Sequence, residues 1–338
     1  MKSLKIFCLA AVAVGAVVAT SVFADGRKPG SVLIFPVHRS GAAAGWITVV
    51  NVTNINTLPQ TPVSFGGSTL VHYDYVNTIP NPQDEQMPLG CVRFDRVEFL
   101  TPADTLSVLT SCHNAVNING QQGYLVVSAQ DPAQFGIDWS HNFLMGSELV
   151  LNGSGTMYSM NALPFAAIPA AGLPTDLDFQ GDLDFDGVEY EPIPDTLYID
   201  SFLAVAQSQL ALLNLTGGPD AVTLVQMDVW NDNEFPLSTT KLFKCWFDVP
   251  LVNVSPLFDQ FFLRNNTPND PNELDVNCDN LGDFETGWAR INGVVATTSR
   301  DVFPNPALLG AITTGPAATV GGGHLLWESN ATQANGSF

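Results

Sequence analysis

The chain has 338 residues, of which 46% are hydrophobic and 13% are charged, and its 12 Lys and Arg against 33 Asp and Glu give a formal net charge of −21. This acidity excludes a nucleic-acid-binding protein, because such a protein needs basic side chains to replace the counterions of the phosphate backbone. The low charged fraction excludes a coiled coil, and the apolar content excludes a disordered chain.

The N-terminus has the three parts of a secretory signal peptide. Lys2 and Lys5 precede an apolar run over residues 6–18, and Ala24 ends a small-residue cleavage site. We therefore predict a signal peptide over 1–24 and export to the extracellular space or the cell surface. Because no later stretch approaches about 18 uninterrupted apolar residues, we expect no transmembrane segment.

Six segments of the first half recur in the second half in the same order, which indicates an internal duplication. The matches are Asn51–Thr53 with Asn214–Thr216, Leu70–Asn77 with Leu224–Asn231, Cys91 with Cys245, Cys112–Asn114 with Cys278–Asn280, Gly123–Tyr124 with Gly287–Trp288, and Asn142–Gly146 with Asn305–Gly310. They predict a first domain over 25–165, an acidic linker over 166–195, and a second domain with a C-terminal tail over 196–338.

Short runs rich in Val, Tyr, Phe and Thr indicate strands, since Gly, Pro, Asn and Asp clusters bound them. In the first copy these runs are 46–52, 69–76, 92–100 and 124–129. Helical periodicity is not evident outside the signal peptide. We expect an all-β fold of two tandem immunoglobulin-like antiparallel β-sandwich domains. The Cys–Trp–Cys order of antibody domains is absent, so the expectation concerns architecture only.

Four cysteines lie outside the signal peptide, namely Cys91, Cys112, Cys245 and Cys278. An even number in an exported chain predicts two disulfides. If each copy folds alone, each pairs its own two cysteines, which gives Cys91–Cys112 and Cys245–Cys278.

The predicted linker is the most acidic part of the chain, and residues 97–240 contain no Lys or Arg. Asp182-x-Asp184-x-Asp186-Gly187 has the spacing of the first half of a calcium loop, although Ile193 stands where the last ligand, Glu, is usual. We predict that calcium is bound by Asp178, Asp182, Asp184, Asp186 and Glu189. The ion would stiffen the joint and fix Leu183 and Phe185 against a sandwich. The alternatives are a solvated linker and a strand pair with aspartates on one face.

The sequence contains no recognisable catalytic motif. Its five histidines form no HExxH pattern, and neither a Gly-x-Ser-x-Gly elbow nor a phosphate-binding loop is present. Asp138, His141 and a serine would make a triad only by a chance arrangement. We therefore expect no catalytic residues and no enzymatic activity.

The leading functional hypothesis is a secreted structural or assembly protein, such as a surface-layer or filament subunit, that associates with itself or with other cell-surface proteins. The alternative is a carbohydrate-binding or adhesive module that stacks tryptophans on glycans. Its candidate residues are Trp139, Trp230, Trp246, Trp288 and Trp327. A secreted hydrolase is the third hypothesis.

Overall fold

The computed structural model describes residues 28–41, 45–114, 121–153, 157–204, 208–218, 220–268, 278, 284–314, 321–327 and 338. The signal peptide predicted over 1–24 lies outside these residues. Strands dominate the described chain and pair in antiparallel fashion, so the all-β prediction is confirmed. In the described ranges, no helix combines the length and the apolar composition needed to cross a membrane.

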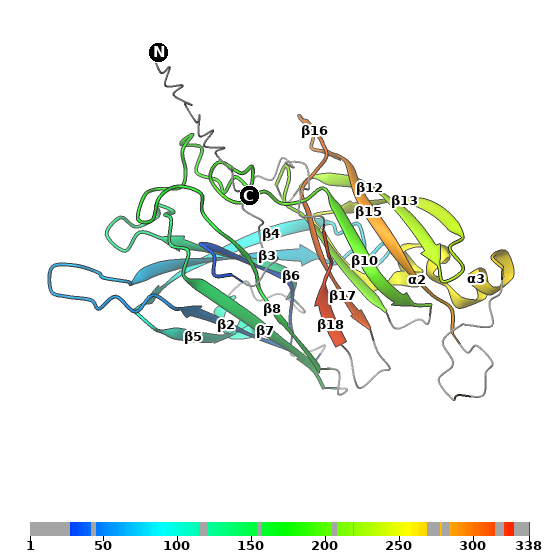
Figure 1. Ribbon diagram of the computed structural model, residues 1–338, viewed down its shortest axis with the longest axis horizontal. Coiled ribbons are helices and arrows are strands. Elements are labelled where there is room, and N and C mark those ends of the chain that lie inside the picture. The colour runs from blue at the N-terminus through cyan, green and yellow to red at the C-terminus, as the bar shows by residue number, and fades with distance from the viewer. Residues whose placement is uncertain are drawn as a thin grey trace, which may run out of the picture.

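The first half of the chain forms two sheets that pack face to face (Figure 1). Its elements are β1 (Val32–Ser40), β2 (Trp46–Asn54), β3 (Thr69–Ile79), β4 (Gly90–Leu100), β5 (Thr105–Leu109), α1 (Thr110–His113), β6 (Gln121–Gln130), β7 (Leu144–Asn152), β8 (Met157–Asn161) and β9 (Leu163–Phe165). The strand orders are β4-β3-β6-β1-β9 and β5-β2-β7-β8. Along β3, Val71, Tyr73 and Tyr75 point into the core while His72 and Asp74 point outward, as the two-residue period of a strand requires.

The second half forms a second pair of packed sheets. Its elements are β10 (Thr196–Leu203), β11 (Gln209–Asn214), β12 (Val222–Asn231), β13 (Pro236–Lys244), β14 (Trp246–Pro250), α2 (Leu251–Val254), η1 (Pro256–Phe258), α3 (Gln260–Asn266), β15 (Thr286–Thr297), β16 (Val302–Pro304), β17 (Leu308–Thr314) and β18 (Gly321–His324). The orders are β10-β15-β12-β13, with β16 beside β15, and β14-β11-β17-β18. Leu212, Met227 and Phe247 lie in the core between these sheets.

The two sandwiches share one strand order. The path β4-β3-β6-β1 corresponds to β13-β12-β15-β10, and β5-β2-β7-β8 corresponds to β14-β11-β17-β18. An immunoglobulin constant domain instead places its first, second, fifth and fourth strands in one sheet and its third, sixth and seventh in the other. Only the pairs of second with fifth and third with sixth strands agree, so the connectivity differs from the immunoglobulin order.

A third core lies between the sandwiches, which sit side by side in Figure 1. The outer face of the β4-β3-β6-β1 sheet packs on the outer face of the β14-β11-β17-β18 sheet, with β1 against β11 and β17 and β14 against β6. Ile34 and Tyr124 of the first sandwich meet Leu213 and Leu309 of the second in this core. Burying apolar area here stabilises one relative placement of the two units.

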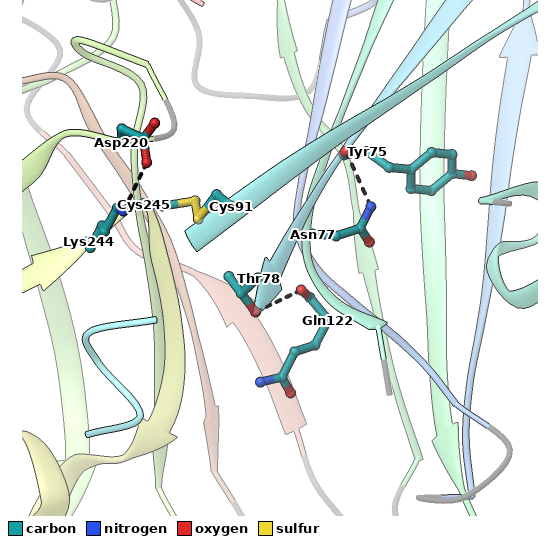
Figure 2. The surroundings of a disulfide bond; sticks show 8 residues. All are labelled: Tyr75, Asn77, Thr78, Cys91, Gln122, Asp220, Lys244 and Cys245. Carbon is teal, nitrogen blue, oxygen red and sulfur yellow. Dashed lines mark hydrogen bonds and ion pairs between the residues drawn. A yellow bond between two sulfur atoms is a disulfide. The ribbon is translucent and has the colours of Figure 1, made fainter. Parts of the chain in front are cut away.

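An ion pair and a disulfide also tie the sandwiches together. Arg39 Nε donates to Asp248 Oδ2 at 3.0 Å. Cys91, at the start of β4, is bonded to Cys245, between β13 and β14, and Figure 2 shows Lys244 and Asp220 beside this bond in a 2.8 Å ion pair.

The pairing Cys91–Cys112 and Cys245–Cys278 is therefore wrong. Cys112 and Cys278 are exposed and unpaired in the part of the chain that the structure describes. The prediction assumed that each copy folds alone. Because the copies share a core, docking brings the Cα atoms of Cys91 and Cys245 to 6.7 Å, within the range that a disulfide bridges.

Candidate metal centre

Residues 166–195, here called the acidic segment, are fixed to the sandwiches by buried apolar side chains rather than held in solvent. Leu183 and Phe185 are buried in the third core, and the Phe185 ring contacts Phe165 of β9 at a centroid distance of 5.2 Å. Ile168 donates its N–H to the carbonyl oxygen of Glu189 at 2.8 Å, which joins the two ends of the segment. The anchors therefore hold the intervening carboxylates in one region.

Tight turns fold the acidic chain back on itself. Gly181 donates its N–H to Asp176 Oδ2 at 3.2 Å, and Gln180 donates its N–H to Asp178 Oδ1 at 3.0 Å. Phe179 and Gly181 take the left-handed conformation, with φ of 63° and 80°. The reversal places the carboxyl groups of Asp176 and Asp178 next to the later part of the segment.

Carboxylates gather in two groups that share Asp178. One group is Asp176, Asp178 and Glu189, and the other is Asp178, Asp182 and Asp184; in each, the candidate ligand atoms lie within 4.8 Å of one another. The prediction included all of these except Asp176, which belongs to the same acidic run but precedes the calcium-loop pattern. Only its alternation with Asp178 in the sequence could have suggested it.

The structure places the predicted ligand Asp186 in a different role. Its Oδ1 accepts the N–H of Val188 at 2.7 Å and that of Glu189 at 3.3 Å, and neither carboxylate group contains it. Asp186 closes the turn that positions Glu189. Glu191, farther along, accepts the N–H of Ala166 at 3.0 Å and forms an ion pair with Lys28.

The group of Asp176, Asp178 and Glu189 contains buried acceptors that lack donors. Glu189 is 3% exposed, and its Oε2 has no hydrogen-bond partner among the described residues; the same holds for the buried Oδ1 of Asp176. The other oxygen of Glu189, Oε1, accepts the N–H of Leu177. Burial raises the pKa of Glu189, and charge repulsion from Asp184 and Asp176 raises it further. The backbone N–H groups of Leu177 and Asp184 oppose the shift.

The donor set of this group suits calcium. Ca²⁺ prefers carboxylate and carbonyl oxygens at about 2.3–2.6 Å, so two oxygens on one ion lie at most roughly 5 Å apart. The 4.8 Å limit within the group meets this condition without rearrangement. An ion between the three carboxylates would also pair with the two donorless oxygens, whose burial without a partner is unfavourable. The group of Asp178, Asp182 and Asp184 is half-buried to exposed and rests on clustering alone.

The residues considered for a catalytic triad have separate partners. Asp138 Oδ1 accepts from Ser128 Oγ at 2.8 Å, whereas His141 Nε2 lies 3.1 Å from Asn54 Oδ1 and its ring stacks on Trp139. Among the described residues, no hydrogen bond joins Asp138 to His141. These residues therefore do not form a Ser-His-Asp triad, because the His141 ring is hydrogen-bonded to Asn54 rather than to an acid or a serine hydroxyl.

The candidate glycan-stacking tryptophans are placed differently from one another. Trp246 is buried in the third core. Trp230 and Trp288 stack on each other at 4.0 Å on the outer face of β12 and β15, where Trp288 is 39% exposed. Trp139 donates its indole N–H to Thr69 Oγ1 at 3.1 Å.

No protein-family model matches the chain, and no curated protein or solved structure matches it either.

Proposed function

We propose that the chain is a secreted, non-enzymatic structural or assembly protein of the cell surface, built from two β-sandwiches that work as one stiff unit. The observation that carries the proposal is the third core, which joins the sandwiches through a buried apolar layer, an ion pair and a disulfide. A construction unit of a surface layer or filament must transmit force without bending at its joint, and these three ties provide that property.

Common descent from one duplicated domain is part of this proposal. The shared strand order supports it, and so does the register: Val76 lies opposite Tyr124 as Trp230 lies opposite Trp288. The strand pairs β1–β6 and β10–β15 also carry a bulge at the corresponding place, between Phe35 and His38 in β1 and between Ile199 and Phe202 in β10.

Calcium is proposed as the stabilising ion of the joint. The carboxylates of Asp176, Asp178 and Glu189 lie on the segment whose apolar side fills the third core. Binding of Ca²⁺ removes their mutual repulsion and fixes the segment, which stiffens the contact between the sandwiches.

One sheet face offers a surface for self-association. An apolar patch, here called the β2–β7 patch, covers one end of the outer face of the β5-β2-β7-β8 sheet. It consists of Ile47, Val49, Leu109, Leu149, Leu151 and Met157. Val49 lies opposite both Leu109 and Leu149, and Ile47, Leu109 and Met157 are 44%, 38% and 56% exposed. Contiguous exposed apolar surface of this kind commonly marks a protein interface.

Light scattering after size exclusion, with negative-stain microscopy, tests the assembly proposal on the mature protein in calcium. We expect concentration-dependent oligomers that Leu109→Ser/Met157→Ser abolishes. Val63→Ser is the matched control, because Val63 is 95% exposed and lies outside the patch. A monomer at all concentrations, with and without calcium, would overturn the proposal.

A second candidate function, glycan binding, is favoured by the exposed tryptophan pair. Trp288 is 39% exposed and stacks on Trp230, and the guanidinium of Arg290 lies 5.9 Å from the Trp230 ring centroid and forms a 2.6 Å ion pair with Asp228. Aromatic faces flanked by charged groups stack on sugar rings. A glycan array probed with wild type and Trp288→Ala tests it: binding that the variant loses supports this function, and absence of binding by the folded wild type excludes it.

A further inference from the structure

A cleft of about 350 Å³ opens on the outer face of the β4-β3-β6 sheet, next to the acidic segment. Asp74, Asp95 and Gln130 come from its sheet floor, Phe135 and Asp138 from the loop after β6, and Leu183 from the acidic segment. The carboxylates of the candidate metal centre do not line this cleft. The two places are adjacent, because Gly181 lines the cleft and donates its N–H to Asp176 of the metal centre.

Negative charge in the cleft exceeds its positive charge. Arg93 is the permanent cation of the lining, and it pairs with Asp74 at 3.2 Å. Asp95 lies 3.8 Å from His72, which is charged only when protonated. Asp138 bonds to the neutral hydroxyl of Ser128. Burial raises the pKa of Asp138, and the charge of Asp176 adds to this. Hydrogen bonds from Ser128 and from the Gln130 side chain, together with the charge of a protonated His72, oppose the shift. The carboxylates of Asp95 and Asp138 therefore lack a permanent counter-charge.

An unpartnered acceptor at the same place requires a donor. Gln130 is 5% exposed, and its Oε1 has no hydrogen-bond partner in the described chain. Asp74 Oδ1 is likewise buried without a partner. Buried acceptors of this kind are rare, since each costs free energy unless a donor reaches it.

The remaining lining is apolar, with Leu183, Val97 and Val126 on the walls and floor. The ring of Phe135 is 77% exposed at the rim. A ring at this place can cover an aliphatic stem or interact with a cation through its face.

We infer that this cleft binds an alkylammonium group on an apolar stem, with the ammonium at Asp138 and Gln130 and the stem against Phe135 and Leu183. A primary ammonium has three donors and one positive charge. These match the Asp138 carboxylate, which has hydrogen-bond donors but no permanent counter-charge, and the unpartnered amide oxygen of Gln130. The same chemistry occurs in free diamines and in the lysine side chains of a partner protein. The inference is independent of the proposed assembly function.

Isothermal titration of the full mature chain, at saturating calcium, tests the inference with three probes. Cadaverine represents a free diamine, acetyl-Gly-Lys-Gly-amide represents a protein lysine, and n-hexanol is the uncharged control. We expect saturable binding of at least one amine and none of hexanol. We expect Asp138→Asn to weaken amine binding at least tenfold, because a charge-assisted hydrogen bond is lost. Phe135→Ala weakens it about threefold and, at an exposed position, does not disturb folding.

Asp200→Asn is the matched control, since it removes the same charge from an exposed site on the second sandwich. Stronger binding of the peptide than of cadaverine identifies a protein partner, and the reverse identifies a small amine. The inference is overturned if neither amine saturates, if hexanol binds as well as the amines, or if Asp138→Asn and Asp200→Asn weaken binding equally. Should Asp138→Asn fail to fold, an unchanged affinity of Phe135→Ala overturns it.

Discussion

Trp246 of the second sandwich donates its indole N–H to the carbonyl oxygen of Pro36 in the first, at 2.7 Å. The donor is 1% exposed and lies in the third core, and Pro36 lies within the irregular stretch of β1 between Phe35 and His38. The irregularity turns the Pro36 carbonyl away from the regular ladder. The indole supplies the donor that this buried carbonyl needs, so a local bulge becomes a specific contact between the two units.

Trp246→Phe removes that donor but keeps an aromatic ring. We expect the free energy of unfolding to fall by about 1–3 kcal/mol, because the Pro36 carbonyl stays buried without a partner. Urea denaturation followed by circular dichroism measures the loss. Trp288→Phe is the control, since Trp288 is 39% exposed and lies outside the third core. Equal losses in the two variants would show that the hydrogen bond contributes nothing specific.

Removal of the disulfide by Cys91→Ser/Cys245→Ser is expected to lower stability strongly. The bond closes a loop between residues 154 positions apart, and loop-closure entropy for that length corresponds to about 5 kcal/mol. Thermal melts of the oxidised wild type, the reduced wild type and the double variant test this. Cys112→Ser should melt like the wild type, because Cys112 is exposed and unbonded. A non-reduced peptide map that links Cys91 to Cys112 would contradict the pairing.

The strands were predictable from sequence because their alternation depends only on neighbouring residues. Thr69–Val76 and Val92–Leu100 were expected as strands and lie within β3 and β4. Two of the matches between the halves also occupy equal register positions, since Asn77 lies opposite Gly123 and Asn231 lies opposite Gly287.

Other sequence matches joined residues that are not structurally equivalent, because short motifs recur by chance along similar strands. Asn54, not Asn51, has the role of Asn214: each accepts the N–H of the residue two positions later at the end of its strand, at 3.0 and 2.9 Å. Cys91 is the second residue of β4, whereas Cys245 follows the end of β13, so they are not equivalent positions.

The contact between the halves could not be predicted from the sequence. Outward-facing apolar residues such as Ile34 and Leu213 look like ordinary core residues until the second layer is known. The assumption of independent copies therefore led to the wrong disulfides. The same assumption gave no reason to expect that the acidic segment packs into the third core, where burial of its apolar residues positions the carboxylates.

Two buried histidines should make the protein sensitive to acid. His38 is fully buried and His141 is 3% exposed, and burial lowers the pKa of each to about 4. In the unfolded chain, each histidine binds a proton below its ordinary pKa of about 6.5, whereas the folded state does so only near pH 4. The free energy of unfolding therefore decreases as the pH falls from 6.5 to 4, by about 3 kcal/mol per histidine. His38→Leu should reduce this loss in urea titrations at pH 7 and pH 4.5. An unchanged difference between the two pH values would contradict the prediction.

Glu148 should produce the opposite pH dependence. Glu148 is 1% exposed, and neither of its carboxylate oxygens has a hydrogen-bond partner in the described ranges. Burial raises its pKa well above the usual value, and the charge of Asp248 raises it further. The folded state keeps a proton that the unfolded chain releases above about pH 4.3, so stability falls as the pH rises from there towards the folded-state pKa. Glu148→Gln should remove this slope and exceed the wild type in stability at pH 8, while the exposed control Glu234→Gln changes neither. A variant less stable than the wild type at pH 8 would show that the carboxylate is ionised and paired.

Glu189→Gln tests the metal centre and the assignment of its ligands together. Calcium at a hundredfold excess over its Kd should stabilise the wild type by about 2.7 kcal/mol, and EGTA should reverse the rise in melting temperature. The variant should lose this response because a buried charged ligand is gone. In EGTA it should be at least as stable as the wild type, since an amide beside Asp176 no longer repels that carboxylate and can donate to its unpartnered oxygen.

Asp186→Asn is the matched control: its side-chain oxygen can still accept the N–H of Val188, so its calcium response should persist. Loss of the response in Asp186→Asn alone would place the ion in the loop that the sequence pattern indicated, and a wild type indifferent to EGTA would show that the carboxylates hold no calcium.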